Sequence, residues 1–291
     1  MRAAHTNANV RVAVIGGSGV YEIEGMKVLR TFHPTTPFGK PSDPITIGEY
    51  HGVSCAFLPR HGKGHRLLPS EIPQRANFYA LKMLGVEHVV ALSACGSLKE
   101  KLRPRDFVIP SQIVDRTKGR PSTFFGDGIV AHVAFAHPFS RTLSDTLHAA
   151  ATDVGATVHR GETYLCMEGP AFSTKAESLL HRELKCGVVG MTAAPEAKLA
   201  REAEMSYALL AMVTDYDGWK DDEEVTVEIV VGNLLANAAL AKKAIARLLP
   251  RLTDLPNDCA SALSGAIFTS PSAIKPAAKK RLAALIGKYI K

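Results

Sequence analysis

The stretch Tyr207-Ala-Leu-Leu-Ala-Met-Val213, followed by Thr214-Asp-Tyr-Asp-Gly-Trp219, decides the fold of this chain. Seven apolar residues in a row are typical of a strand that is buried on both faces of a sheet. Thr214 to Asp217 are then expected just past its carboxyl end, where open α/β sheets bind ligands. Asp215 and Asp217 are costly to bury there unless something uses them, and the alternative is that one caps a helix and the other is solvated.

Strands and helices alternate along most of the chain. Strands are predicted at 11–15, 45–50, 53–58, 88–92, 107–109, 112–114, 163–167 and 188–191, and helices at 71–84, 140–154, 175–185, within 192–204 and at 223–249. This alternation predicts a three-layer α/β/α fold with a central mixed, largely parallel sheet. We expect a single domain over residues 1–255, then a linker and a basic C-terminal helix over 256–291.

Composition narrows the class of protein. With 291 residues, of which 46% are apolar, the chain is long enough to bury a large core. Its five cysteines are scattered without a Cys-x-x-Cys pair, which favours reduced thiols in a cytoplasmic protein. We expect no signal peptide, because the N-terminus is polar, and no membrane span, because no uninterrupted apolar run approaches about eighteen residues.

The positive charge is concentrated at one end. Six of the seven net positive charges lie between Lys275 and Lys291, so the main body is nearly neutral and nucleic acid is not an expected partner. This terminal segment is predicted to be a basic amphipathic helix that is solvated or packs against a subunit. Attachment to a membrane surface is the alternative.

Gly16-Gly-Ser-Gly19 directly follows the first predicted strand. A glycine turn in this position lets backbone N–H groups approach an anion, although a plain tight turn has the same composition. A dinucleotide-binding frame would require glycine at position 22, which is Glu22, and no Walker lysine is present.

The loop Pro59-Arg-His-Gly-Lys-Gly-His65 is a second candidate for binding anions, because Arg60 offers a forked contact to phosphate oxygens. His61 and His65 have the spacing of a metal pair on a helix. However, Gly62 and Gly64 disfavour that helix and no third ligand is apparent, so we expect no metal.

Two further loops carry small or aromatic residues after a strand. Ser93-Ala-Cys-Gly-Ser97 follows the strand at 88–92, and Glu168-Gly-Pro-Ala-Phe-Ser-Thr174 follows the strand at 163–167. Phe172 either packs inward or stacks on a flat base.

Taken together, these loops resemble one family. Gly-Gly-Ser-Gly, Pro-Arg-His-Gly, Ala-Cys-Gly-Ser-Leu, Glu-Gly-Pro-x-Phe-Ser, Met-Thr-x-x-Pro-Glu and Thr-Asp-Tyr-Asp-x-Trp occur in the order found in the trimeric purine nucleoside phosphorylases. The resemblance covers roughly residues 10 to 250. It implies a homotrimer that acts on a nucleoside with inorganic phosphate as co-substrate and without a metal or organic cofactor.

The resemblance also implies roles for individual residues. Phosphate would contact Ser18, Arg60, His61, Ser93, Ala94 and Thr192. Met191 would lie under the ribose, Phe172 would flank the base, Val227, Val230 and Val231 would line a methylthio pocket, and His132 would reach a neighbouring subunit's site. Relatives often carry Thr where this chain has Ser18 and Ser93, and either hydroxyl can donate.

The residues that read the base indicate adenine. Relatives that act on 6-oxopurines place Glu at the position of Ser173 and Asn at the position of Asp215. Ser173, Asp215 and Asp217 therefore resemble an adenine-reading set, in which Asp215 protonates purine N7. The implied reaction is phosphorolysis of methylthioadenosine to adenine and 5-methylthioribose 1-phosphate. A 6-oxopurine phosphorylase, a hydrolytic nucleosidase and a non-catalytic purine-binding protein remain alternatives.

Overall fold

The computed structural model describes residues 10–16, 23–220 and 226–290. Its strands are β1 (Val12–Gly16), β2 (Lys27–Phe32), β3 (Ile45–Tyr50), β4 (Val53–Pro59), β5 (His88–Ser97), β6 (Phe107–Ile109), β7 (Gln112–Asp115), β8 (Val158–Arg160), β9 (Thr163–Cys166), β10 (Val188–Gly190) and β11 (Ser206–Asp215). Its α-helices are α1 (Gln74–Met83), α2 (Arg141–Asp153), α3 (Lys175–Glu183), α4 (Ala193–Glu202), α5 (Val227–Leu248), α6 (Pro276–Arg281) and α7 (Ala283–Ile286), with 3-10 turns at Leu249–Leu252 and Pro271–Ala273.

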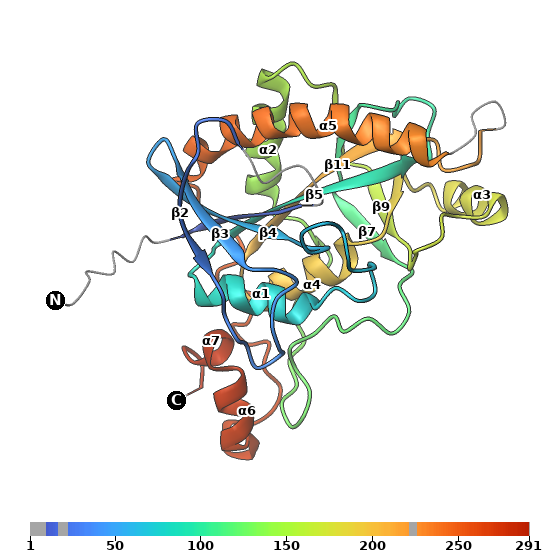
Figure 1. Cartoon of the computed structure of the whole chain (residues 1–291). Helices are drawn as coiled ribbons and strands as arrows, with labels where there is room; N and C mark the ends of the chain where they lie inside the picture. The colour runs from blue at the N-terminus through green and yellow to red at the C-terminus, as the bar shows by residue number, and fades with distance from the viewer. Residues whose placement is uncertain (1–9, 17–22, 221–225, 291) are drawn as a thin grey trace.

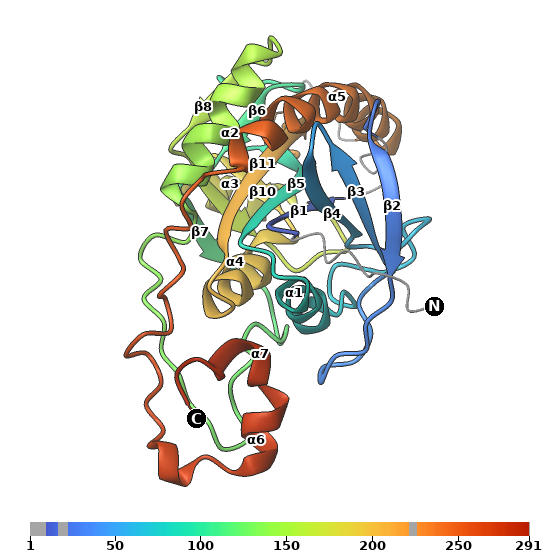
Figure 2. The same cartoon turned by 90° about the vertical axis from the view of Figure 1, so that its left-hand side faces the viewer.

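The strands form one mixed sheet with helices on both faces, so the predicted three-layer α/β/α class is confirmed (Figure 1). β5 lies at its centre and pairs in parallel with β1 on one side and with β11 on the other. Figure 2 shows α2 and α5 on one face of the sheet and α1 and α4 on the other. The carboxyl ends of β1, β5 and β11 therefore meet at the same edge of the sheet.

The run that opens β11 is buried on both faces, as predicted. Tyr207, Leu209, Ala211 and Val213 belong to the core under α1 and α4, whereas Ala208, Leu210 and Met212 belong to the core under α2 and α5. Burying each large apolar side chain contributes about 1.5–3 kcal/mol, so this strand joins the two cores strongly. The hairpin predicted around His51-Gly52 is also present, with β3 and β4 antiparallel and both turn residues at positive φ.

Two local predictions differ from the structure. Ser93–Ser97, expected to be a loop, continues β5, because its first four residues pair in parallel with β11 and its last two pair antiparallel with β10. β2 was not predicted, because most of Lys27–Phe32 is solvent-exposed and lacks a clear alternation of apolar residues. The start of the helix predicted at Glu223 lies outside the described residues.

The C-terminal segment forms two short helices instead of the single predicted helix. The chain turns at Leu282, which is both the C-cap residue of α6 and the N-cap residue of α7. This turn allows Leu282, Leu285 and Ile286 to enter the core beside α1. Tyr79 Oη donates to the carbonyl of Arg281 at 3.0 Å, and Lys288 forms a 2.6 Å ion pair with Glu204.

One helical segment, Val227–Leu252, is apolar and long enough to cross a membrane by length and composition, within the part of the chain that the structure describes. In the fold it covers the sheet, where Ala241, Ala244 and Ile245 pack into the core with β11 and α2.

Because Leu282 is fully buried, we expect Leu282→Ala to lower the free energy of unfolding by roughly 2–5 kcal/mol. The matched control is Leu179→Ala on α3, where the side chain is exposed and the expected change is within about 0.5 kcal/mol. Denaturant unfolding of both variants is the measurement. Equal stability of the two would contradict the packing of the C-terminal segment against the main body.

Candidate active site

A cleft of about 340 Å³ opens at the carboxyl ends of β5, β10 and β11. It brings together ten of the residues predicted from the sequence: Arg60, His61, Ser93, Ala94, Phe172, Met191, Thr192, Asp215, Asp217 and Val230. These residues come from loops far apart in the chain. The shared cleft follows from the parallel arrangement of their strands.

Arg60 lies at the end of the cleft predicted for phosphate and is fixed by a buried ion pair. Its guanidinium donates to both carboxylate oxygens of Glu196 on α4, at 2.6 and 3.1 Å, and to the carbonyl of Leu92 at 2.6 Å. Tyr207 Oη donates a further hydrogen bond to Glu196, at 2.8 Å. Nearby, the hydroxyls of Ser93 and Thr192 lie 3.4 Å apart.

His61 is neutral at physiological pH. Its pKa is lowered to about 4, chiefly by burial and also by the charges of Arg60, His65 and Arg120, against the hydrogen bond to Leu67. Because the carbonyl of Leu67 can only accept, Nδ1 of His61 donates at 2.9 Å and Nε2 is left as an acceptor.

His61 and His65 do not form a metal pair. Their rings stack at 4.2 Å with an angle of 10° between the planes. Lone pairs in two parallel planes do not converge on one ion. Among the described residues, no group of three or more His, Cys, Asp and Glu side chains is placed to hold a metal.

Asp215 and Asp217 form the opposite end of the cleft, and both are buried. Burial raises the pKa of Asp215, against the hydrogen bonds that it accepts from Thr214 Oγ1 at 2.7 Å and from the backbone N–H of Asp217 at 2.8 Å. The pKa of Asp217 is raised to about 6, chiefly by burial and also by the charge of Asp215. Burial thus favours the protonated form of both carboxyl groups.

Ser173 supports this end of the cleft from behind. Its hydroxyl donates to Oδ1 of Asp217 at 3.0 Å. The buried hydroxyl of Ser178 also acts on this carboxyl, and both hydroxyls lower its pKa against the effect of burial.

Three predicted residues, Val227, Val231 and His132, do not line the cleft. Val227 and Val231 are exposed on α5 and do not line the cleft, whereas Val230 and Leu234, one turn apart on the same face, do. His132 lies on the surface, where its ring meets that of the exposed Phe268 at 4.9 Å. Ser18 lies outside the described residues.

Several residues at the site were missed by the sequence analysis. Glu196 pairs with Arg60, Gly96 lies against both aspartates, and Met167, Thr214 and Leu234 line the cleft. Glu196 had two available signals, since it ends the Met-Thr-x-x-Pro-Glu motif and is an acid in the first turn of a helix that follows a buried strand.

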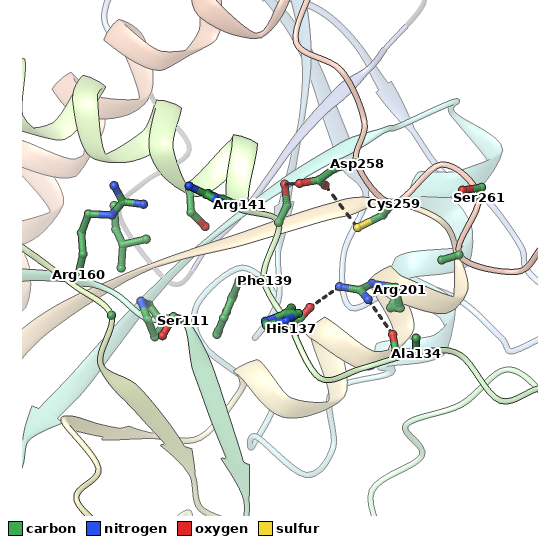
Figure 3. A pocket seen from close by; sticks show the side chains of 16 residues that line it. Ser111, Ala134, His137, Phe139, Arg141, Arg160, Arg201, Asp258, Cys259 and Ser261 are labelled. Atoms are coloured by element: carbon green, nitrogen blue, oxygen red, sulfur yellow. Dashed lines mark hydrogen bonds between the residues drawn. The ribbon is translucent and has the colours of Figure 1, made fainter.

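A larger depression of about 940 Å³ lies between α2, α4 and the segment around Asp258 (Figure 3). It gathers Arg141, Arg160 and Arg201, but these cations already have partners. Arg201 donates to the carbonyls of Ala134 and His137, and Asp145 pairs with both of the other arginines. The smaller cleft, where buried carboxyls face open space, is therefore the candidate active site.

The signature described as Phosphorylase superfamily matches residues 11–251. This chain belongs to that superfamily. The resemblance to nucleoside phosphorylases that the loop motifs indicated is thus confirmed.

Individual relatives are similar over almost their whole length. A protein of Geobacter sulfurreducens named S-methyl-5'-thioadenosine phosphorylase is 50% identical over 282 residues, covering 96% of this chain and 99% of the relative. The crystal structure of a methylthioadenosine phosphorylase from an antarctic soil metagenomic library has a TM-score of 0.92 at 46% identity, covering 96% of this chain and 99% of that one. A Schistosoma mansoni methylthioadenosine phosphorylase in complex with adenine has a TM-score of 0.83 at 36% identity, covering 88% of this chain and 98% of that one.

The raised pKa of Asp217 predicts a pH dependence of stability. Between about pH 4, where an unfolded Asp titrates, and pH 6, the folded state binds more protons at this group than the unfolded state does. The stability contributed by protonated Asp217 is therefore full below pH 4 and is lost as the pH rises through 6. We expect the free energy of unfolding of the wild type to fall by about 2 kcal/mol relative to Asp217→Asn across this window. Denaturant unfolding of both proteins at pH 4, 5, 6 and 7 measures the difference, and parallel curves would refute the shift.

Proposed function

We propose that this chain catalyses the phosphorolysis of S-methyl-5'-thioadenosine to adenine and 5-methylthioribose 1-phosphate. The observation that carries the proposal is the pair of buried aspartates with raised pKa values at one end of a cleft whose other end holds Arg60, Ser93 and Thr192. The similarity to methylthioadenosine phosphorylases over nearly the full chain supports it.

The reaction requires charge to be balanced at both ends of the breaking bond. Cleavage of the N-glycosidic bond leaves positive charge on the sugar and negative charge on the purine. Phosphate bound near Arg60 and Thr192 attacks C1', and the proton of Asp215 goes to N7 of the leaving base. His61, with Nε2 as an acceptor, suits a hydrogenphosphate that carries one proton.

Recognition of adenine follows from the second acid. Asp217 lines the cleft, and a carboxylate oxygen can accept from an exocyclic amino group. A 6-oxopurine would instead present an acceptor to that oxygen, so a 6-oxopurine nucleoside is the less favoured substrate. The mechanism needs no metal or organic cofactor.

A homotrimer in the cytoplasm, without a nucleic-acid or membrane partner, is part of the same proposal. His132 is exposed beside Val130 and Phe268, which are 47% and 71% exposed, and an exposed apolar group of this kind fits contact with a neighbouring subunit. Light scattering coupled to size-exclusion chromatography tests the trimer.

The decisive assay measures base release with and without phosphate. We expect adenine release from methylthioadenosine only when phosphate is present, and much slower hypoxanthine release from inosine. Adenine release without phosphate would indicate a nucleosidase, and a preference for inosine would indicate a 6-oxopurine phosphorylase.

Replacing the proposed acid tests the mechanism. Asp215→Asn cannot protonate N7, so we expect kcat for methylthioadenosine to fall by about 10²–10⁴-fold. The control is Asp127→Asn, whose carboxylate is 81% exposed and should leave kcat unchanged. Steady-state kinetics on both variants is the measurement, and unchanged adenine release by Asp215→Asn would refute the role.

A further inference from the structure

Arg120 is a buried cation next to the candidate active site that does not line the cleft. Its side chain is only 3% exposed, although it belongs to the loop that follows β7. A charge so deeply placed is costly unless it is paired and hydrogen-bonded. The hydrogen-bond acceptors around the Arg120 guanidinium therefore indicate the role of this residue.

The hydrogen-bond acceptors of Arg120 come from two turns at the carboxyl ends of β9 and β10. On the β9 side they are the carbonyl of Met167 at 3.4 Å, the carbonyl of Glu168 and the Glu168 carboxylate at 3.1 Å. On the β10 side the acceptor is the carbonyl of Met191, at 2.5 Å. The planar guanidinium thus bridges two neighbouring parallel strands just beyond their last paired residues.

Both turns contribute side chains to the cleft. Met167 comes from one, and Met191 and Thr192 come from the other. The peptide between Met191 and Thr192 is planar, so a guanidinium that holds the Met191 carbonyl also fixes the direction of the Thr192 N–H. Arg120 thereby controls the position of a residue predicted to lie under the ribose and of one predicted to bind phosphate.

The loop that carries Arg120 is anchored at a second point. Buried Glu202, on α4, accepts hydrogen bonds from Thr123 Oγ1 and from the N–H of Phe124, both at 2.7 Å. Arg120 therefore projects from a fixed segment, so its hydrogen bonds to the two turns have a defined geometry.

We propose that Arg120 is a positioning residue, which holds the Met191–Thr192 turn against the Met167–Glu168 turn so that phosphate and sugar are bound in register. This inference rests on the proposed phosphorolysis. It requires the forked shape of the guanidinium as well as its charge, because one planar group serves acceptors on two strands.

The test compares Arg120→Lys and Arg120→Ala with the wild type and with Arg116→Ala, whose side chain is exposed on the same segment. We expect Arg120→Lys to raise KM for phosphate and to lower kcat/KM at least 10-fold, because an ammonium group does not bridge both turns. We expect Arg116→Ala to match the wild type. Adding guanidinium ion at millimolar concentration should restore part of the activity of Arg120→Ala and none of any loss in Arg120→Lys, where the amine occupies the space.

Thermal unfolding of each variant separates positioning from folding. If Arg120→Ala does not fold, the KM for phosphate of folded Arg120→Lys decides the question. Wild-type kinetic constants in Arg120→Lys would overturn the positioning role while leaving the proposed function intact. Adenine release by the wild type without phosphate would instead overturn the proposed function, whatever the variants do.

Discussion

The buried ion pair between Arg60 and Glu196 is the constraint on which the candidate site depends. It joins the end of β4 to the first turn of α4, and the same guanidinium also reaches the carbonyls of Ile15 on β1 and Leu92 on β5. Tyr207 of β11 completes the network through Glu196. Five elements thus meet at one pair of charges, and removing charges from water costs several kcal/mol per ion unless such bonds compensate. The geometry of this end of the cleft is therefore set by the fold.

The two ends of the cleft differ in charge because Arg60 is paired with a carboxylate, whereas burial favours the neutral forms of the two aspartates. Arg60 keeps its charge, since a carboxylate lies against it. Asp215 and Asp217 have raised pKa values because burial disfavours their ionised forms, and for Asp217 the charge of Asp215 acts in the same direction. A cation close to these acids would lower their pKa and remove the proton that a leaving purine needs. The proposed phosphorolysis therefore requires that Arg60, with its partner Glu196, lie apart from the two aspartates.

The sequence predicts most of this architecture because its signals are local. The apolar run of β11 could be recognised as a strand buried on both faces, and the loops at strand ends could be assigned to one edge of the sheet. The continuation of β5 through Ser93–Ser97 could not, because small residues look like a loop until β11 and β10 are present to pair with them. The burial of Glu196 and Arg120 could not be predicted either. A charged residue in a helix or loop reads as solvated, and only tertiary packing reveals the partners that permit its burial.

The close approach of β5 to the two aspartates depends on a glycine. A Cβ at Gly96 would lie 2.9 Å from Cβ of Asp217, closer than real Cβ atoms approach, and at a tight 3.0 Å from Oδ1 of Asp215. β5 can therefore lie against the acids only because position 96 has no side chain. This explains why a residue unfavourable in strand interiors occurs in the longest buried pairing of the sheet. The weak local signal at 93–97 and the dense packing of the two carboxyl groups have a common cause, which is that the strand gives up side-chain volume to make room for the acids.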